Sequence, residues 1–228
     1  MVRRRVSDLQ GIELFNKLGD DDLREVEPYV VEGSFEKKET IFNEGDSPEW
    51  FYILKSGKVK ITRLSRDGKE VILELISPDD MFGGVAVIKG FSYPANAVAM
   101  EDSVVLKISR KNLIRLLDRF PNLMHCIALQ LGERMKNSHD TLKNIALERV
   151  EARIAALLLK LADKVGVKSK DGISIDMKLT KQDIADMVGT TVETSIRTFS
   201  KFRKKGVLED SGGRIVIKDE EALKSFSS

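Results

Sequence analysis

The chain has 228 residues, of which 42% are hydrophobic and 32% are charged, and its formal net charge is +2 at pH 7. This composition is typical of a soluble globular protein with one large or two modest domains, and it excludes attraction of nucleic acid by the overall charge. The single cysteine, Cys126, excludes an internal disulfide framework and a four-thiolate zinc or iron–sulfur site. We find no signal peptide and no membrane-length apolar stretch, so we expect a cytoplasmic protein without a membrane partner.

Residues 1–119 predict a β-rich domain behind a short helical start. Helix signals cover residues 9–18, and three aspartates at 20–22 cap a further turn that reaches Tyr29. Between residues 30 and 108, short runs such as VVEGSF, KVKITRL and EVILELI alternate or are β-branched, and turn signals such as Asp67-Gly68 separate them. Many short strands at even spacing predict a sandwich or a jelly-roll barrel.

Residues 120–147 predict one long helix that begins at Pro121. Its apolar positions are spaced by four and three, with one polar interruption. This spacing predicts a coiled-coil seam that pairs two copies of the chain. The alternative is an amphipathic helix that lies on the barrel. The seam residues are Met124, Ala128, Leu131, Met135, Ser138, Leu142 and Ile145.

Residues 148–228 predict a helix followed by a helix-turn-helix. Apolar residues indicate a short helix that Gly189 ends, and a second helix rich in lysine and arginine begins near Val192. Ser211-Gly212-Gly213 between two apolar runs then predicts a hairpin of the kind expected for a wing. A basic helix alone is usually a solvated face. The order of helix, turn, basic helix and hairpin instead predicts a domain that binds double-stranded DNA.

The predicted order is a barrel, a long helix and a winged helix-turn-helix. In this order and in its motifs the chain resembles the CRP/FNR family of transcription regulators over nearly its whole length. The resemblance implies an α+β fold with an N-terminal jelly-roll barrel of the cyclic-nucleotide-binding type, a long dimerisation helix and a C-terminal winged helix-turn-helix. It also implies a homodimer on a palindromic operator, with RNA polymerase as a partner if the protein activates transcription. The matches are Asn43-Glu44-Gly45-Asp46, Tyr52-Ile53-Leu54, Ser56-Gly57-Lys58-Val59, Asp67-Gly68-Lys69-Glu70, Met81-Phe82-Gly83 and Thr180 to Arg197.

In that family, an acid and an arginine of the second helix touch bases, and here they match Glu193 and Arg197. Glu193 would accept a hydrogen bond from cytosine and Arg197 would donate to guanine. The alternative is an ordinary surface salt bridge between the two. Val192 makes the half-site resemble the FNR type, and Ile196 departs from that type and could contact a thymine methyl. Phosphate contacts that position the domain are expected from Thr180, Lys181, Thr190, Thr191 and Lys201.

This sequence departs from the family's pattern at the residues that bind a cyclic nucleotide. Gly84 replaces the acid that holds the ribose, Tyr93 replaces the arginine that neutralises the phosphate, and Pro94 replaces the hydroxyl residue. Because a buried phosphate without a paired cation is costly, we expect a small-molecule effector other than cyclic AMP or cyclic GMP. The candidate effector pocket comprises Phe82, Gly83, Gly84, Val85, Tyr93, Pro94, Ala95, Ser138 and His139.

The sequence leaves haem open as a cofactor, because some members of the family hold it between the barrel and the long helix. A haem-dependent gas or redox sensor of the same fold is therefore the alternative function. The only histidines, His125 and His139, lie on the long helix, too far apart to ligate one iron within a chain. A cupin-like enzyme is excluded because the barrel region has no histidine. The sequence does not identify the effector or the target promoters, and it does not tell whether the protein activates or represses transcription.

Overall fold

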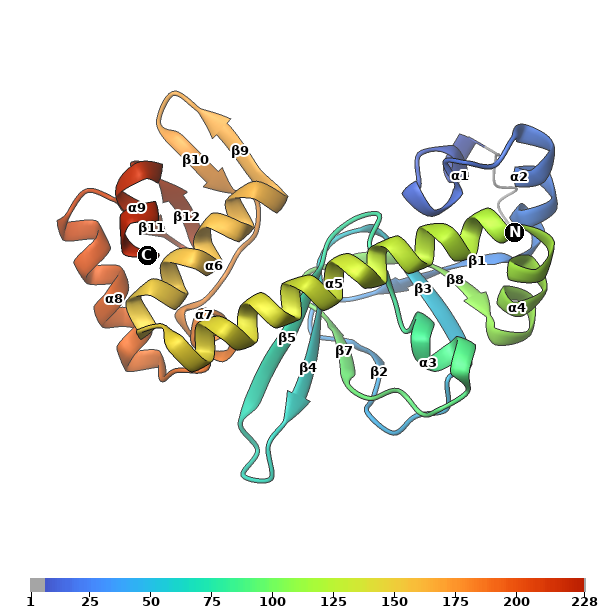
Figure 1. Cartoon of the computed structure of the whole chain (residues 1–228), viewed down its shortest axis with the longest axis horizontal. Helices are drawn as coiled ribbons and strands as arrows, with labels where there is room; N and C mark the ends of the chain where they lie inside the picture. The colour runs from blue at the N-terminus through green and yellow to red at the C-terminus, as the bar shows by residue number, and fades with distance from the viewer. Residues whose placement is uncertain (1–6, 228) are drawn as a thin grey trace. The chain divides into compact units, whose positions relative to one another are not determined.

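The structure, a computed structural model, describes residues 7–227 (Figure 1). Residues 1–6 and 228 lie outside the described residues. The predicted domain boundaries include these residues, and the expectation of no signal peptide concerns the first of them. The chain divides into two units: an N-terminal unit of residues 1–69 and 73–135, and a C-terminal unit of residues 70–72 and 136–228. In the described part of the chain, no helix has both the length and the apolar character needed to cross a bilayer.

Two four-stranded sheets form the body of the N-terminal unit, and they confirm the expected jelly-roll architecture. The first sheet has the order β1-β8-β3-β6, and the second has the order β2-β7-β4-β5. The pairings are antiparallel, such as Val30 with Ile108 and Phe51 with Ile108. The strands are β1 (Val30–Phe35), β2 (Thr40–Phe42), β3 (Trp50–Ser56), β4 (Val59–Leu64), β5 (Glu70–Ile76), β6 (Met81–Phe82), β7 (Asn96–Ala99) and β8 (Ser103–Ser109).

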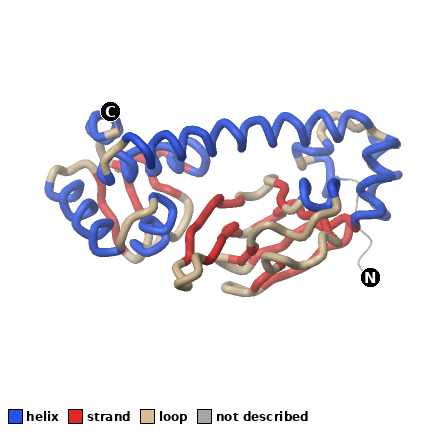
Figure 2. Tube along the Cα trace, turned by 60° about the horizontal axis from the view of Figure 1, so that its bottom comes forward, coloured by secondary structure: helices blue, strands red, loops and turns tan. Residues whose placement is uncertain are grey.

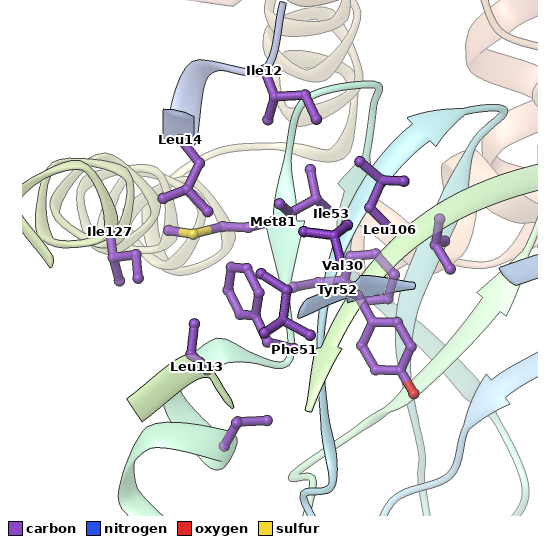
Figure 3. Packing of buried hydrophobic residues seen from close by; sticks show 14 of the residues in the cluster. Ile12, Leu14, Val30, Phe51, Tyr52, Ile53, Met81, Leu106, Leu113 and Ile127 are labelled. Carbon is purple, nitrogen blue, oxygen red and sulfur yellow. The ribbon is translucent and has the colours of Figure 1, made fainter. Parts of the chain in front are cut away.

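Short helical segments complete the N-terminal unit. They are α1 (Ser7–Gln10), the 3-10 turns η1 (Glu13–Phe15) and η2 (Glu27–Tyr29), α2 (Asp20–Val26), α3 (Gly84–Lys89) and α4 (Arg110–Arg119). Side chains from η1, β3 and the long helix meet in one buried cluster, in which Figure 3 labels Leu14, Phe51 and Ile127. The expected helix over residues 9–18 is wrong. The chain forms α1 and η1 instead, because it turns at Gly11, and Gly19 rather than an aspartate is the N-cap of α2.

The long helix is α5 (Pro121–Leu147), drawn as one uninterrupted blue tube in Figure 2. It begins and ends where the sequence predicts. Leu123, Cys126 and Ile127 on one face are buried against the N-terminal unit, which leaves Cys126 as a small buried hydrophobe. The other face carries exposed apolar side chains of the predicted seam, namely Met124, Met135, Leu142 and Ile145.

The C-terminal unit has α6 (Val150–Val165) at its centre. A four-stranded sheet of order β11-β12-β10-β9 lies with it, and the last helix, α9 (Glu220–Phe226), packs against α6. The helix-turn-helix is α7 (Lys181–Val188) and α8 (Val192–Lys204), and the predicted wing is the hairpin of β11 (Leu208–Ser211) and β12 (Arg214–Ile217). The loop expected at residues 168–172 belongs to a second hairpin, β9 (Gly166–Ser169) and β10 (Gly172–Ile175).

Candidate nucleic-acid interface and sensor pocket

A reciprocal cap fixes the first helix of the helix-turn-helix. The Thr180 hydroxyl accepts a hydrogen bond from the backbone N–H of Asp183 at 3.0 Å, and the Asp183 carboxylate accepts from the N–H of Thr180 at 2.8 Å. Both donors would otherwise lack a partner at the helix start. Gly189 ends α7 with φ of 67°, a left-handed conformation that favours glycine, and the chain turns there into α8.

Helix α8 has one buried face and one exposed face. Thr191 caps it by accepting from the N–H of Thr194 at 3.3 Å. The buried face consists of Ser195, Thr198, Phe199 and Phe202. Ile196 is 50% exposed, and Glu193 and Arg197 are exposed beside it, because positions three and four apart share a face. The departure at positions 195 and 196 therefore turns the isoleucine outward and the serine inward.

The acid and the arginine of α8 remain available to an outside partner. Within the described residues, no ion pair joins Glu193 to Arg197; the Arg197 guanidinium instead donates to the Thr194 hydroxyl at 3.3 Å. A hydrogen bond from its own backbone N–H, with help from Thr191 and the charge of Arg197, holds the pKa of Glu193 below its usual range. Glu193 is thus an ionised acceptor at neutral pH. The alternative of a surface salt bridge is not what the structure shows.

The five candidate phosphate contacts all have partners inside the C-terminal unit. Thr180 and Thr191 are N-caps, and the N–H of Thr190 donates to the Ala185 carbonyl at 3.0 Å. The Lys201 ammonium lies 2.5 Å from the Glu151 carboxylate, and the Lys181 ammonium lies 2.7 Å from that of Asp210. Sequence reasoning missed these acids, since they are 50 and 29 positions away along the chain and no local pattern connects them.

In the N-terminal unit, the predicted effector pocket begins at the corner between β6 and α3. Gly83 has φ of 75°, and Gly84 is the first residue of α3. A Cβ on Gly84 would lie 3.0 Å from Cε2 of Phe51, which is closer than side chains ordinarily pack. Phe51 itself is fully buried. A side chain at position 84 would therefore require the Phe51 ring to shift by a few tenths of an ångström.

Aromatic rings fill the space between the two segments of this pocket. Tyr93 stacks on Phe42 with 3.9 Å between ring centroids, and Tyr52 stacks on Phe82 with 5.0 Å between them. The Tyr93 hydroxyl donates to the Trp50 carbonyl at 2.5 Å and accepts from the Trp50 N–H at 3.1 Å. Burial raises the pKa of Tyr93. Tyr93 is thus a buried ring whose hydroxyl is bonded to the backbone of Trp50.

The remaining candidate pocket residues do not supply a buried charge. Ala95 is buried beside Tyr93, whereas Val85 and Pro94 are exposed. Lys89 is exposed at the last turn of α3. Ser138 and His139 belong to the C-terminal unit, and both are exposed on α5. Among the residues that the structure describes, none of the candidates is a buried cation that could neutralise a cyclic phosphate.

Haem finds no fitting ligand among the described residues. The chain has two histidines, and both His125 and His139 are exposed on α5. No group of three histidine, cysteine, aspartate or glutamate side chains in the described part of the chain lies close enough to hold a metal ion. Iron in haem needs a protein donor directed at it from a pocket. We therefore derive no function for haem from this structure.

Two family models match the two units. The cyclic nucleotide-binding domain matches residues 32–120, and the Crp-like helix-turn-helix domain matches residues 152–226. The chain belongs to the CRP/FNR family of transcriptional regulators. Its relatives are regulators rather than enzymes.

This regulator is 29% identical to the global nitrogen regulator of Synechocystis sp. over 92% of each chain. It is 26% identical to the cyclic AMP receptor protein of Thermus thermophilus over 96% of its own length and 98% of the relative's. The solved structure of a CooA mutant from Carboxydothermus hydrogenoformans matches it with a TM-score of 0.78 and 25% identity, over 95% of this chain and 94% of that one. These relatives confirm the predicted family and fold.

The hydroxyl of Tyr93 gives a first prediction. Tyr93→Phe leaves the Trp50 N–H and carbonyl without their side-chain partner, so it should lower the free energy of unfolding of the N-terminal unit by about 1–3 kcal/mol. Urea unfolding followed by fluorescence measures this unit, because Trp50 is the single tryptophan. Tyr29→Phe is the matched control, since the Tyr29 ring is half-buried beside Arg115. Equal losses of unfolding free energy in Tyr93→Phe and Tyr29→Phe would show that the hydrogen bonds of Tyr93 to Trp50 do not stabilise the unit.

Proposed function

We propose that this regulator acts as a homodimer on a palindromic, FNR-like DNA operator and that its signal is not a cyclic nucleotide. The observation that carries the proposal is the exposed face of α8, where Glu193, Ile196 and Arg197 are presented by a helix whose other face is buried. An acid, an apolar group and a guanidinium are suited to cytosine, a thymine methyl and guanine, respectively. Val192, half-buried in the first turn, keeps the likeness to the FNR half-site.

Exposed apolar side chains on α5 support the homodimer. Met124, Met135, Leu142 and Ile145 of the seam are between 41% and 65% exposed, and Ala128 and Ser138 are also exposed. A contiguous stripe of this kind normally marks a protein interface. Pairing along the stripe would place two copies of α8 for half-sites about one helical turn, roughly 34 Å, apart. Leu131 differs from the other seam residues, because it packs partly against the N-terminal core.

The aromatic cluster supports a signal other than a cyclic nucleotide. Tyr93 and Phe42 stack where we expect a ligand phosphate to need a cation, and a side chain at Gly84 would require the ring of Phe51 to shift. The relative from Mycobacterium tuberculosis, 28% identical over 83% of this chain and 84% of its own, is named a cAMP-activated regulator. We propose that the present regulator departs from that relative in its effector.

Arg197→Ala tests the reading of DNA by α8. It should lower the ratio of specific to non-specific affinity by about tenfold to a hundredfold per half-site, since one bidentate base contact is lost. Fluorescence anisotropy with an operator selected from a random pool measures this ratio. Lys204→Ala removes an exposed cation from the same helix and should weaken binding to all sequences alike. If Arg197→Ala leaves the ratio of specific to non-specific affinity unchanged, Arg197 does not contact a base.

Leu142→Glu tests the dimer. Leu142 is 65% exposed and lies on the seam, so a buried charge there should raise the dimer dissociation constant on the order of a hundredfold without disturbing a core. Sedimentation equilibrium gives the constant. Thr141→Glu is the matched control, because the exposed Thr141 is adjacent but off the seam, and it should leave the dimer intact. If Leu142→Glu remains dimeric, the interface lies elsewhere.

Thermal unfolding with added ligand tests the signal. Cyclic AMP and cyclic GMP should leave the unfolding midpoint unchanged, whereas operator DNA should raise it by mass action and so serves as the positive control. Haemin should neither raise the midpoint nor show a shifted Soret band. A rise with either nucleotide would overturn our interpretation of Gly84 and Tyr93, and a shifted Soret band would direct attention to His125 and His139.

A further inference from the structure

An acidic side chain of the wing joins both helices of the helix-turn-helix. The Asp210 carboxylate in β11 lies 2.7 Å from the Lys181 ammonium at the start of α7. Its other oxygen lies 3.4 Å from Nε of Arg203 near the end of α8. The second contact has the distance of an ion pair but not the geometry of a hydrogen bond. The Asp210 side chain is only 14% exposed and holds Lys181 directly, whereas the Arg203 side chain is 51% exposed and only lies near the carboxylate.

The Lys181 ammonium is held by more than this carboxylate. It lies 3.9 Å from the centre of the Phe199 ring, and Phe199 is fully buried. Only 23% of the Lys181 side chain is exposed. A cation between a carboxylate and an aromatic face is already well solvated by the protein. It would have to leave both partners to reach a DNA phosphate.

The neighbouring acid, Glu209, is bound differently. Its side chain is 70% exposed and pairs with Lys218 of the segment after β12 at 3.2 Å. Successive residues of a strand point to opposite faces, so Asp210 faces the helices while Glu209 does not. The two carboxylates carry the same charge one residue apart, and they differ in the cations that they hold.

We propose that Asp210 is a specificity-determining positioning residue, which withholds Lys181 from DNA phosphates and fixes the wing strand to the helix-turn-helix. This inference rests on the proposed function of α8 in reading DNA. Binding that is independent of sequence grows with each phosphate neutralised, whereas base contacts alone discriminate between sequences. Withholding Lys181 therefore lowers affinity for random DNA and leaves a larger share of binding to Glu193 and Arg197.

Asp210→Asn in the full-length protein tests the proposal. We would measure anisotropy with a random-sequence duplex and with the selected operator over a range of salt concentrations. Each new phosphate contact adds about 0.9 to the slope of log affinity against log salt. The variant should steepen this slope on random DNA by about 0.9 and reduce the ratio of specific to non-specific affinity. Glu209→Gln, with the same change in net charge, should leave the slope unchanged.

Lys181→Gln tests the same arrangement from the other partner. In the wild-type background it should leave the slope unchanged, because the held lysine makes no phosphate contact. In the Asp210→Asn background, Lys181→Gln should lower the slope of log affinity against log salt by about 0.9, back to the wild-type value. Should Asp210→Asn fail to fold, as circular dichroism would show, the slope of Lys181→Gln decides alone.

Two results would overturn the proposal. One is an equal slope for Asp210→Asn and Glu209→Gln. The other is a slope that falls by about 0.9 in Lys181→Gln, which would make Lys181 a phosphate contact already. Failure of the proposed function is distinguishable from both. It would show as a wild-type protein without sequence preference, and the salt slopes on random DNA would remain measurable.

Discussion

The burial of one face of α8 is the constraint on which the DNA-binding end depends. Phe199 and Phe202 have no exposed surface, and together with Ser195 and Thr198 they fix the rotation of the helix about its axis. With 3.6 residues per turn, that rotation leaves no choice about which side chains face outward. Packing of the buried face therefore directs Glu193 and Arg197 outward. The caps at Thr180 and Thr191 fix where α7 and α8 begin.

The N-terminal unit keeps the architecture of a nucleotide sensor while its interior has a different chemistry. A cyclic phosphate needs a cation in a poorly hydrated site. Here the matching positions hold stacked rings and a tyrosine hydroxyl bonded to the backbone of Trp50. These contacts connect β2, β3 and β6 to the segment around Tyr93 inside the N-terminal unit. A shared fold does not by itself specify the ligand, which has to be argued from the side chains of the site.

Sequence reasoning predicted what repeats locally and missed what depends on distant partners. The spacing of apolar residues predicted α5 from Pro121 to Leu147, and turn chemistry predicted the wing and the hairpin around Gly68. Strands β2 and β6 escaped prediction because three and two residues are too few to show a period. The replacement of an acid by Gly84 was visible in the sequence. The stacking of Phe42 on Tyr93, and the pairing of Asp210 with Lys181, were not, because folding alone brings these residues together.

The close approach of Phe51 to Gly84 restricts how this sensor could change over evolutionary time. An acid at position 84 meets the Phe51 ring, and a smaller residue at position 51 leaves a cavity in a fully buried core. Positions 84 and 51 are therefore coupled, because a side chain added at one of them requires the ring at the other to move or to become smaller.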